Sequence, residues 1–176
     1  MTTEILLAGF GGQGVLFAGK ILANCGLMDS KELSWLPSYG PEMRGGTANC
    51  TIKISDEEIA SPLAKEIDIL VAMSAPAIDK FEANLRPGGY LFVNSSLVTD
   101  RKYRDDINVV EVNTTALAEE AKNPKGANIV MIGALIKRTG IMTFEGCSDA
   151  IEKYFTEHGK AKFNEANQRA LKIGYE

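Results

Sequence analysis

The stretch Gly9-Phe10-Gly11-Gly12-Gln13-Gly14 follows the apolar run Ile5-Leu6-Leu7-Ala8 and precedes a helical pattern that begins at Val15. A buried strand, a glycine-rich turn and a helix, in that order, predict the start of a nucleotide-binding α/β unit. Glycines let backbone N–H groups approach an anion, and the helix N-terminus adds partial positive charge. The stretch therefore predicts a site for a phosphate-bearing ligand or, as the plainer alternative, close packing of the first strand against the first helix.

The acidic residue that a dinucleotide-binding fold places about 20 residues beyond the glycines has no counterpart here. The second expected strand, residues 32–36, leads into Pro37-Ser38-Tyr39, and Glu32 lies at its wrong end. This absence argues against a free-standing dehydrogenase that uses NAD or NADP. It counts equally against a methyltransferase that uses S-adenosylmethionine, which normally needs an acid at the same place.

Composition limits the class of protein. A chain of 176 residues with 45% hydrophobic and 24% charged residues is most simply one globular domain, residues 1–176. The net charge of -4, with scattered Lys and Arg, argues against nucleic-acid binding. No apolar run reaches the roughly 18 residues of a membrane span, and no signal peptide is evident. The isolated Cys25, Cys50 and Cys147 predict buried thiols in a reducing, cytoplasmic compartment and no metal site.

Strands alternate with helical patterns, which is typical of a layered fold. We expect an α/β, Rossmann-like, mostly parallel central sheet with helices on both faces. The alternating segment 48–54 predicts an edge or antiparallel strand, and the apolar run 67–73 predicts a central parallel strand. The other expected elements are strands at 3–8, 90–93 and 108–112, and helices at 13–25, 76–85 (stopped by Arg86–Gly89 with a left-handed glycine cap), 114–121 (capped by Thr114 or Thr115), 127–138, 147–157 and 160–172.

A second glycine-rich loop, Ser38-Tyr39-Gly40-Pro41-Glu42-Met43-Arg44-Gly45-Gly46-Thr47, follows the second expected strand. It would leave the carboxyl end of that strand beside the first glycine loop, at the edge where open α/β sheets bind ligands. Tyr39, Glu42 and Arg44 supply contact groups, and a guanidinium can donate two parallel hydrogen bonds to a carboxylate or phosphate. The alternative is a structural loop whose Glu42 and Arg44 pair in solvent. Two glycine loops on one edge favour the functional interpretation.

The sequence offers few candidates for catalytic residues. The only histidine, His158, lies in a polar stretch near an expected helix end. The sequence contains no nucleophile elbow, no Walker lysine and no metal-spaced acids, and Glu42 could be a general base only if buried. Small polar residues after the later strands, Ser74 and Asn94-Ser95-Ser96, would line further walls of the same crevice. We therefore expect no catalytic residue and no metal ligand in this chain.

The two loops together, Gly9–Val15 and Ser38–Ala48, resemble the gamma subunit of 2-oxoacid:ferredoxin oxidoreductases, nearest to the 2-oxoglutarate branch. Chain length and order of elements fit the whole of such a subunit. The resemblance implies a complex that decarboxylates a 2-oxoacid on thiamine diphosphate, passes electrons through iron–sulfur clusters to ferredoxin and transfers the acyl group to coenzyme A. Pyruvate and branched-chain 2-oxoacids remain alternative substrates, and a non-catalytic nucleotide-binding module remains an alternative function.

The resemblance also implies how the work is divided between subunits. Thiamine diphosphate and the iron–sulfur clusters would reside on partner subunits, so this chain would hold no cofactor alone and would be inactive in isolation. Its share would be assembly and shaping the approach of coenzyme A or the substrate, with ferredoxin met only through the complex. The residues expected to contact coenzyme A are Gly9, Gly11, Gly12, Gln13, Gly14, Tyr39, Glu42 and Arg44.

Overall fold

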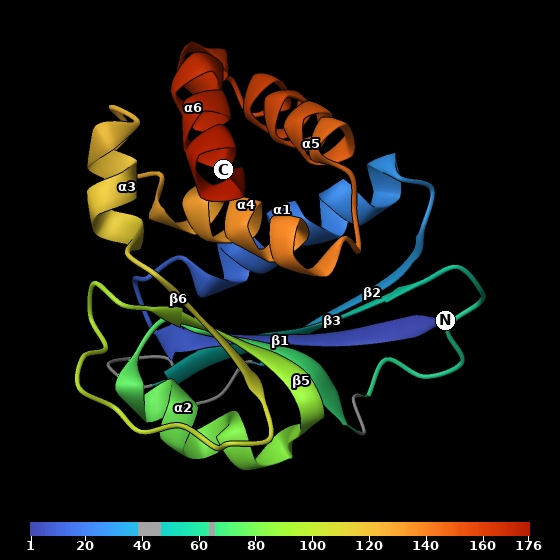
Figure 1. Cartoon of the computed structure of the whole chain (residues 1–176). Coiled ribbons are helices and arrows are strands. Elements are labelled where there is room, and N and C mark those ends of the chain that lie inside the picture. Colours follow the sequence, from blue (N-terminus) through green and yellow to red (C-terminus); the bar gives the residue numbers. More distant parts are fainter. Residues whose placement is uncertain (39–46, 64–65) are drawn as a thin grey trace.

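The computed structural model describes residues 1–38, 47–63 and 66–176 (Figure 1). Its strands form one six-stranded sheet in the order β2-β3-β1-β4-β5-β6. The strands are β1 (Thr2–Phe10), β2 (Glu32–Ser38), β3 (Thr47–Ser55), β4 (Ile67–Ala72), β5 (Leu85–Asn94) and β6 (Asn108–Val112). β3 is antiparallel to both neighbours, whereas β1, β4, β5 and β6 pair in parallel. The expected mostly parallel sheet is confirmed.

The segment predicted as an edge or antiparallel strand is β3, and only the second alternative holds. β3 lies between β2 and β1, so β2 forms the edge of the sheet on this side. The run predicted as a central parallel strand is β4, which lies beside β1 in the middle of the sheet. Both predictions came from the pattern of apolar and polar residues in the sequence. This pattern indicates which faces of a strand are buried, but it does not fix the position of the strand in the sheet.

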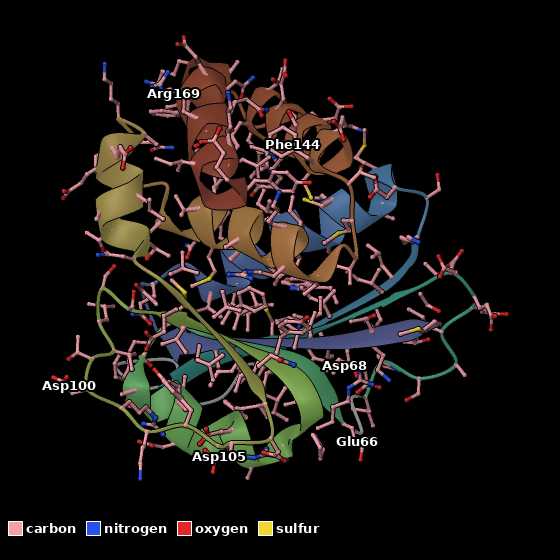
Figure 2. The ribbon with its side chains drawn as sticks, viewed as in Figure 1. Glu66, Asp68, Asp100, Asp105, Phe144 and Arg169 are labelled. Atoms are coloured by element: carbon pink, nitrogen blue, oxygen red, sulfur yellow. The ribbon has the colours of Figure 1, made fainter. Side chains whose placement is uncertain are left out.

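Helices cover both faces of the sheet, as expected (Figure 1). One face is covered by α2 (Ala75–Phe81), which continues into the short 3-10 helix η2 (Glu82–Asn84). The other face is covered by α1 (Val15–Met28), α3 (Thr114–Glu120), α4 (Ala127–Thr139), α5 (Phe144–Glu157), the 3-10 helix η3 (Ala161–Phe163) and α6 (Asn164–Tyr175). Within this layer Phe144, labelled in Figure 2, packs on Tyr175 with ring centroids 5.0 Å apart.

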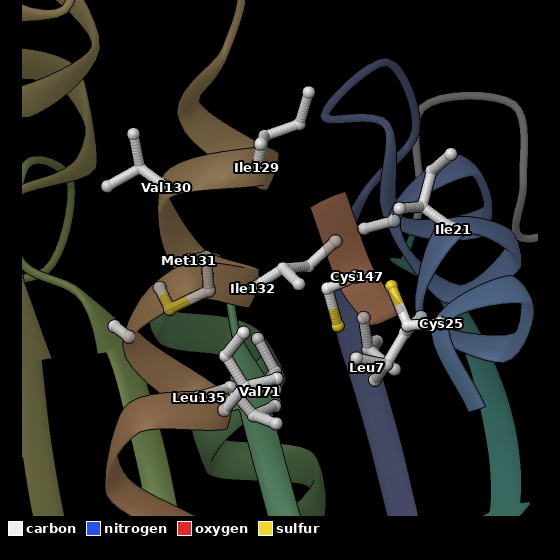
Figure 3. Packing of buried hydrophobic residues seen from close by; sticks show 14 of the residues in the cluster. Leu7, Ile21, Cys25, Val71, Ile129, Val130, Met131, Ile132, Leu135 and Cys147 are labelled. Atoms are coloured by element: carbon white, nitrogen blue, oxygen red, sulfur yellow. The ribbon is translucent and has the colours of Figure 1, made fainter. Parts of the chain in front are cut away.

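The sheet separates two hydrophobic clusters because successive strand residues point to opposite faces. In β1, Leu7 faces α1 and α4, whereas Leu6 belongs to the smaller cluster under α2. The larger cluster joins strand residues such as Leu7 and Val71 to Leu135 of α4, and it also receives Cys25 of α1 and Cys147 of α5 (Figure 3). The carboxyl ends of the strands are thus held by packing on both sides.

From its proline and glycines, the segment Arg86–Gly89 was predicted to end a helix. This prediction is wrong. α2 ends at Phe81, and β5 already begins at Leu85. β5 then carries a bulge, because the residues from Leu85 to Tyr90 lie opposite only Ile67–Ile69 of β4. Proline and glycine are tolerated in a sheet at such irregularities, so the local turn signal was overridden by pairing with the neighbouring strand.

Several helix starts and one cap also differ from the prediction; α6, for example, begins at Asn164 rather than at residue 160. α3 is capped by Asn113, whose side chain accepts from the N–H of Ala116 at 3.3 Å, rather than by Thr114 or Thr115. α5 begins at Phe144, three positions earlier than predicted, because Thr143 caps it. Among the helices of the described residues, none is long and apolar enough to cross a bilayer.

Candidate functional site

The two described ends of the second glycine loop, Ser38 and Thr47, lie near the carboxyl end of β1, where the first glycine loop begins. β3 begins at Thr47, which pairs with Phe10 at the end of β1. β2 ends at Ser38, which pairs with a β3 residue that in turn pairs with Ala8. Both ends of the second loop therefore flank the first. Residues 39–46, with Tyr39, Glu42 and Arg44, lie outside the described residues, and their contacts stay predictions.

The first loop also lies where the fold changes direction. β1 and β4 are neighbours, but α1 follows β1 onto one face and α2 follows β4 onto the other (Figure 1). Just beyond β4, the N–H of Met73 donates to the carbonyl of Ala8 at 2.9 Å. In open α/β sheets, ligands bind at the carboxyl ends of the strands where the connections part in this way.

The glycines of the first loop serve different purposes. A side chain on Gly9 would place its Cβ 2.5 Å from Gln13 Oε1, so Gly9 is needed for close packing. Gly14 has φ of 71°, and a Cβ there would lie 2.5 Å from Asn128 Nδ2. Gly12 has φ of 90°, but a Cβ there would meet no atom within 4 Å. Packing thus accounts for Gly9 and Gly14, whereas Gly12 is glycine for its backbone conformation and leaves open space around it.

Two side-chain amides hold the loop in place. Gln13 accepts from the N–H of Phe10 at 2.6 Å through Oε1 and donates to the carbonyl of Met73 at 3.1 Å through Nε2. From α4, Asn128 Nδ2 donates to the carbonyls of Gln13 at 2.9 Å and Gly14 at 3.3 Å. The carbonyls of Gln13 and Gly14 are thereby bonded from the protein side, and Gly11 and Gly12 are exposed.

Asn128 is a site residue that the sequence did not reveal. It stands 115 positions beyond Gln13, in the first turn of α4, where an Asn resembles an ordinary helix-start residue. Its partners are backbone carbonyls, which no side-chain pattern announces. Only the docking of α4 beside α1 could disclose this contact.

The N-terminus of α1 is free of side-chain caps among the described residues. Gly14 is the N-cap and carries no side chain, and the first turn contains no acidic residue. The first N–H groups of a helix have no partner within the helix, and they favour an anion. The arrangement can therefore receive a phosphate or carboxylate, with the exposed tip of the loop, Gly11 and Gly12, as further backbone donors.

The other expected walls of the crevice are built differently. Asn94 Oδ1 accepts from the hydroxyl of Thr114 at 2.8 Å and from the N–H of Ser96 at 3.1 Å. The Ser96 hydroxyl donates to Asn113 Oδ1 at 2.8 Å. These groups bond one another and link β5 to α3. Ser74 is buried, and its hydroxyl has no hydrogen-bond partner among the residues that the structure describes.

The titratable groups of the described residues differ in their surroundings. Within the described ranges, no group of three or more His, Cys, Asp or Glu side chains could hold a metal ion. His158 is the C-cap residue that follows α5, and its ring stacks on Tyr154 with centroids 4.1 Å apart. Burial raises the pKa of Cys50 to about 12. The pKa of Cys25 is raised by its hydrogen bond with Cys147 and by burial. These buried thiols are therefore poor nucleophiles at neutral pH.

Known proteins of similar sequence and structure agree with this architecture. The chain matches the family described as pyruvate ferredoxin/flavodoxin oxidoreductase over residues 4–176. It is 41% identical to the 2-oxoglutarate synthase subunit KorC of Methanocaldococcus jannaschii, with 100% of this chain and 94% of that protein aligned. The crystal structure of a keto/oxoacid ferredoxin oxidoreductase gamma subunit from Geobacter sulfurreducens has a TM-score of 0.86 at 32% identity, covering 99% of this chain and 95% of that one.

A longer chain contains the same fold. It comes from the 2-oxoglutarate:ferredoxin oxidoreductase of Magnetococcus marinus, whose structure has 2-oxoglutarate, coenzyme A and succinyl-CoA bound. The TM-score is 0.86, and the match covers 98% of this chain but 30% of that one, at 19% identity, which shows the fold alone. The family match and the full-length relatives are decisive: the chain belongs to the pyruvate ferredoxin/flavodoxin oxidoreductase family.

Proposed function

We propose that this chain is the gamma subunit of a 2-oxoglutarate:ferredoxin oxidoreductase complex, which converts a 2-oxoacid to its acyl-CoA. The observation that carries the proposal is the 41% identity to a 2-oxoglutarate synthase subunit over essentially the whole of both chains. The first glycine loop, flanked by the ends of the second at Ser38 and Thr47, supports the same interpretation. In this proposal, thiamine diphosphate and the iron–sulfur clusters belong to partner subunits, and ferredoxin meets the assembled complex.

The glycine loop is the part of this chain that we assign to coenzyme A. The uncapped N-terminus of α1 and the exposed Gly11 and Gly12 suit the diphosphate of that molecule. Gly12 fits the role because nothing crowds the space above it. When bound, coenzyme A supplies the thiol that receives the acyl group, and this chain's share is to bind and orient its phosphate end. We propose that Tyr39, Glu42 and Arg44 complete the contact.

The assignment is tested by calorimetric titration of the assembled complex with coenzyme A. Gly12→Ala changes a left-handed position at the proposed contact, and Gly159→Ala is its control, since Gly159 also has positive φ and open space but lies between α5 and η3. We expect Gly12→Ala and Arg44→Ala each to raise Kd about tenfold or more, which corresponds to roughly 1.4 kcal/mol. Unchanged affinity in variants that still assemble would refute the assignment.

The division of labour is tested by dye reduction. The isolated chain is expected not to reduce a viologen dye with 2-oxoglutarate and coenzyme A, whereas the purified complex does so. A panel that includes pyruvate and branched-chain 2-oxoacids separates the branches of the family, because the preferred substrate should give the highest kcat/KM. A native partner set without thiamine diphosphate and iron would favour the alternative of a non-catalytic nucleotide-binding module.

A further inference from the structure

β6 leaves one edge of the sheet open. Among the described residues it pairs with β5 alone, and Figure 1 shows it at the front of the sheet, below α4 and the end of α6. The N–H of Ser95 donates to the carbonyl of Val112 at 3.0 Å, so Val112 turns its main-chain groups toward β5. The main-chain groups of successive strand residues point to opposite sides of the strand. The N–H and C=O groups of Val109 and Glu111 therefore point away from β5. Such a row of free groups is a template for another strand.

A groove runs along this edge on the side of the helices. Its volume is about 580 Å³, enough for several side chains. Apolar, basic and acidic side chains line it together, among them Val110, Leu117, Lys137, Arg138, Glu111 and Glu176. Side chains of a strand added beside β6 would alternate between this groove and the opposite face, which is the arrangement of peptides that extend a sheet.

The charge of the groove points to the chemistry of its partner. Arg138 is exposed, and no hydrogen bond or ion pair joins it to another residue in the described part of the chain. Figure 2 places Asp100 and Asp105 on the side of α2, away from the groove. The other charged groups of the groove already have partners: Glu111 accepts from Tyr103 at 3.2 Å, Glu176 lies 3.8 Å from Lys172, and Lys137 lies over the ring of Tyr175. Among the charged groups that line the groove in the described residues, the guanidinium of Arg138 is therefore the one without a hydrogen bond, ion pair or ring contact.

We propose that the β6 edge docks an extended segment of another subunit of the complex, which pairs with the main chain of Val109 and Glu111 and sets an acidic side chain against Arg138. A helix could not satisfy outward N–H and C=O groups at strand spacing, so the segment is extended. A second copy of this chain fits less well, because symmetric pairing would bring the same cation to both sides of the contact. The opposite edge, β2, contains Pro37, which cannot donate to an added strand.

Amide hydrogen exchange tests the main-chain part of the proposal. The exchange rates of Val109 and Glu111 are measured in the isolated chain and in the assembled complex without coenzyme A, so the outcome does not depend on the ligand site. We expect both amides to exchange at least about tenfold more slowly in the complex, because a new hydrogen bond must open first. Equal rates in the two states would overturn the proposal, and so would protection in the isolated chain that rises with its concentration, which would indicate a second copy.

A charge reversal tests the chemistry of the partner. Arg138→Glu is compared with Lys125→Glu, an exposed cation in the connection between α3 and α4 that changes the net charge equally. The affinity of each variant for the remaining subunits is measured at low and high salt. We expect Arg138→Glu to weaken association roughly tenfold and to lose part of its salt dependence, while Lys125→Glu stays within about twofold of the unmodified chain. Equal effects of the two reversals would overturn the assignment of an acidic partner.

Discussion

Two clusters of small polar residues lie at the carboxyl edge of the sheet, and they use their polar groups in opposite ways. In the cluster at β5 and β6, Asn94, Ser96 and Thr114 bond one another. At β1, by contrast, the Asn128 amide donates to the carbonyls of Gln13 and Gly14, and Gln13 Oε1 accepts from the N–H of Phe10, while the tip of the loop, Gly11 and Gly12, is exposed. The comparison teaches that location at this edge does not make a residue part of a binding site. What distinguishes the glycine loop is its exposed tip, Gly11 and Gly12, whose backbone groups can meet a ligand.

The largest effect is expected at Gly14, where the loop and α4 meet. Gly14→Ala would force a side chain into the left-handed region and against Asn128 Nδ2, which lies 2.5 Å from the Cβ position. We expect a loss of roughly 2–4 kcal/mol in the free energy of unfolding, from backbone strain together with the displaced hydrogen bonds. Denaturant titration of the isolated chain measures it. Gly159→Ala, with φ of 68° and open space, should lose only the strain, about 1 kcal/mol. Equal losses would mean that the loop does not depend on the contact with Asn128.

The cluster at β5 and β6 is expected to matter for stability alone. Thr114→Val keeps the shape of a fully buried side chain but removes the hydroxyl that donates to Asn94. The free energy of unfolding should fall by about 1–2 kcal/mol, and the affinity of the assembled complex for coenzyme A should not change. Thr115→Val is the matched control on an exposed neighbour, where we expect a change below about 0.5 kcal/mol. A clear loss of coenzyme A affinity in Thr114→Val would move this cluster into the binding site.

The difference between these clusters also marks how far sequence reasoning reaches. The glycine loop was predictable because its signal is local: an apolar run, glycines and a helical pattern stand next to one another. The roles of Asn128 and Thr114 were not predictable, because each bonds a group at least 20 positions away. The bulge in β5 was missed for a related reason. Its Pro87-Gly88-Gly89 signals a turn locally, and only pairing with β4 makes it part of a strand.

We expect the smallest change in stability at Asn128. The same substitution should distinguish the two clusters most clearly, because it should change the affinity for coenzyme A. Asn128→Ala removes the donor to the carbonyls of Gln13 and Gly14, on a side chain that is only partly buried. Water can replace that donor, so we expect a loss of about 1 kcal/mol in the free energy of unfolding. The loop would nevertheless lose the contact that orients its N–H groups, and Kd for coenzyme A in the assembled complex should rise about tenfold.

Asn123→Ala provides the comparison for that measurement. Asn123 also donates through its side-chain amide, to Asn167 Oδ1 at 2.9 Å, but it stands in the connection between α3 and α4 and touches no part of the loop. Its loss should lower stability by a similar amount and leave coenzyme A affinity unchanged. If both variants changed affinity equally, the effect would belong to the stability of the helical layer. If neither did, the backbone of the loop would hold its conformation through Gln13 alone, and α4 would have no part in the site.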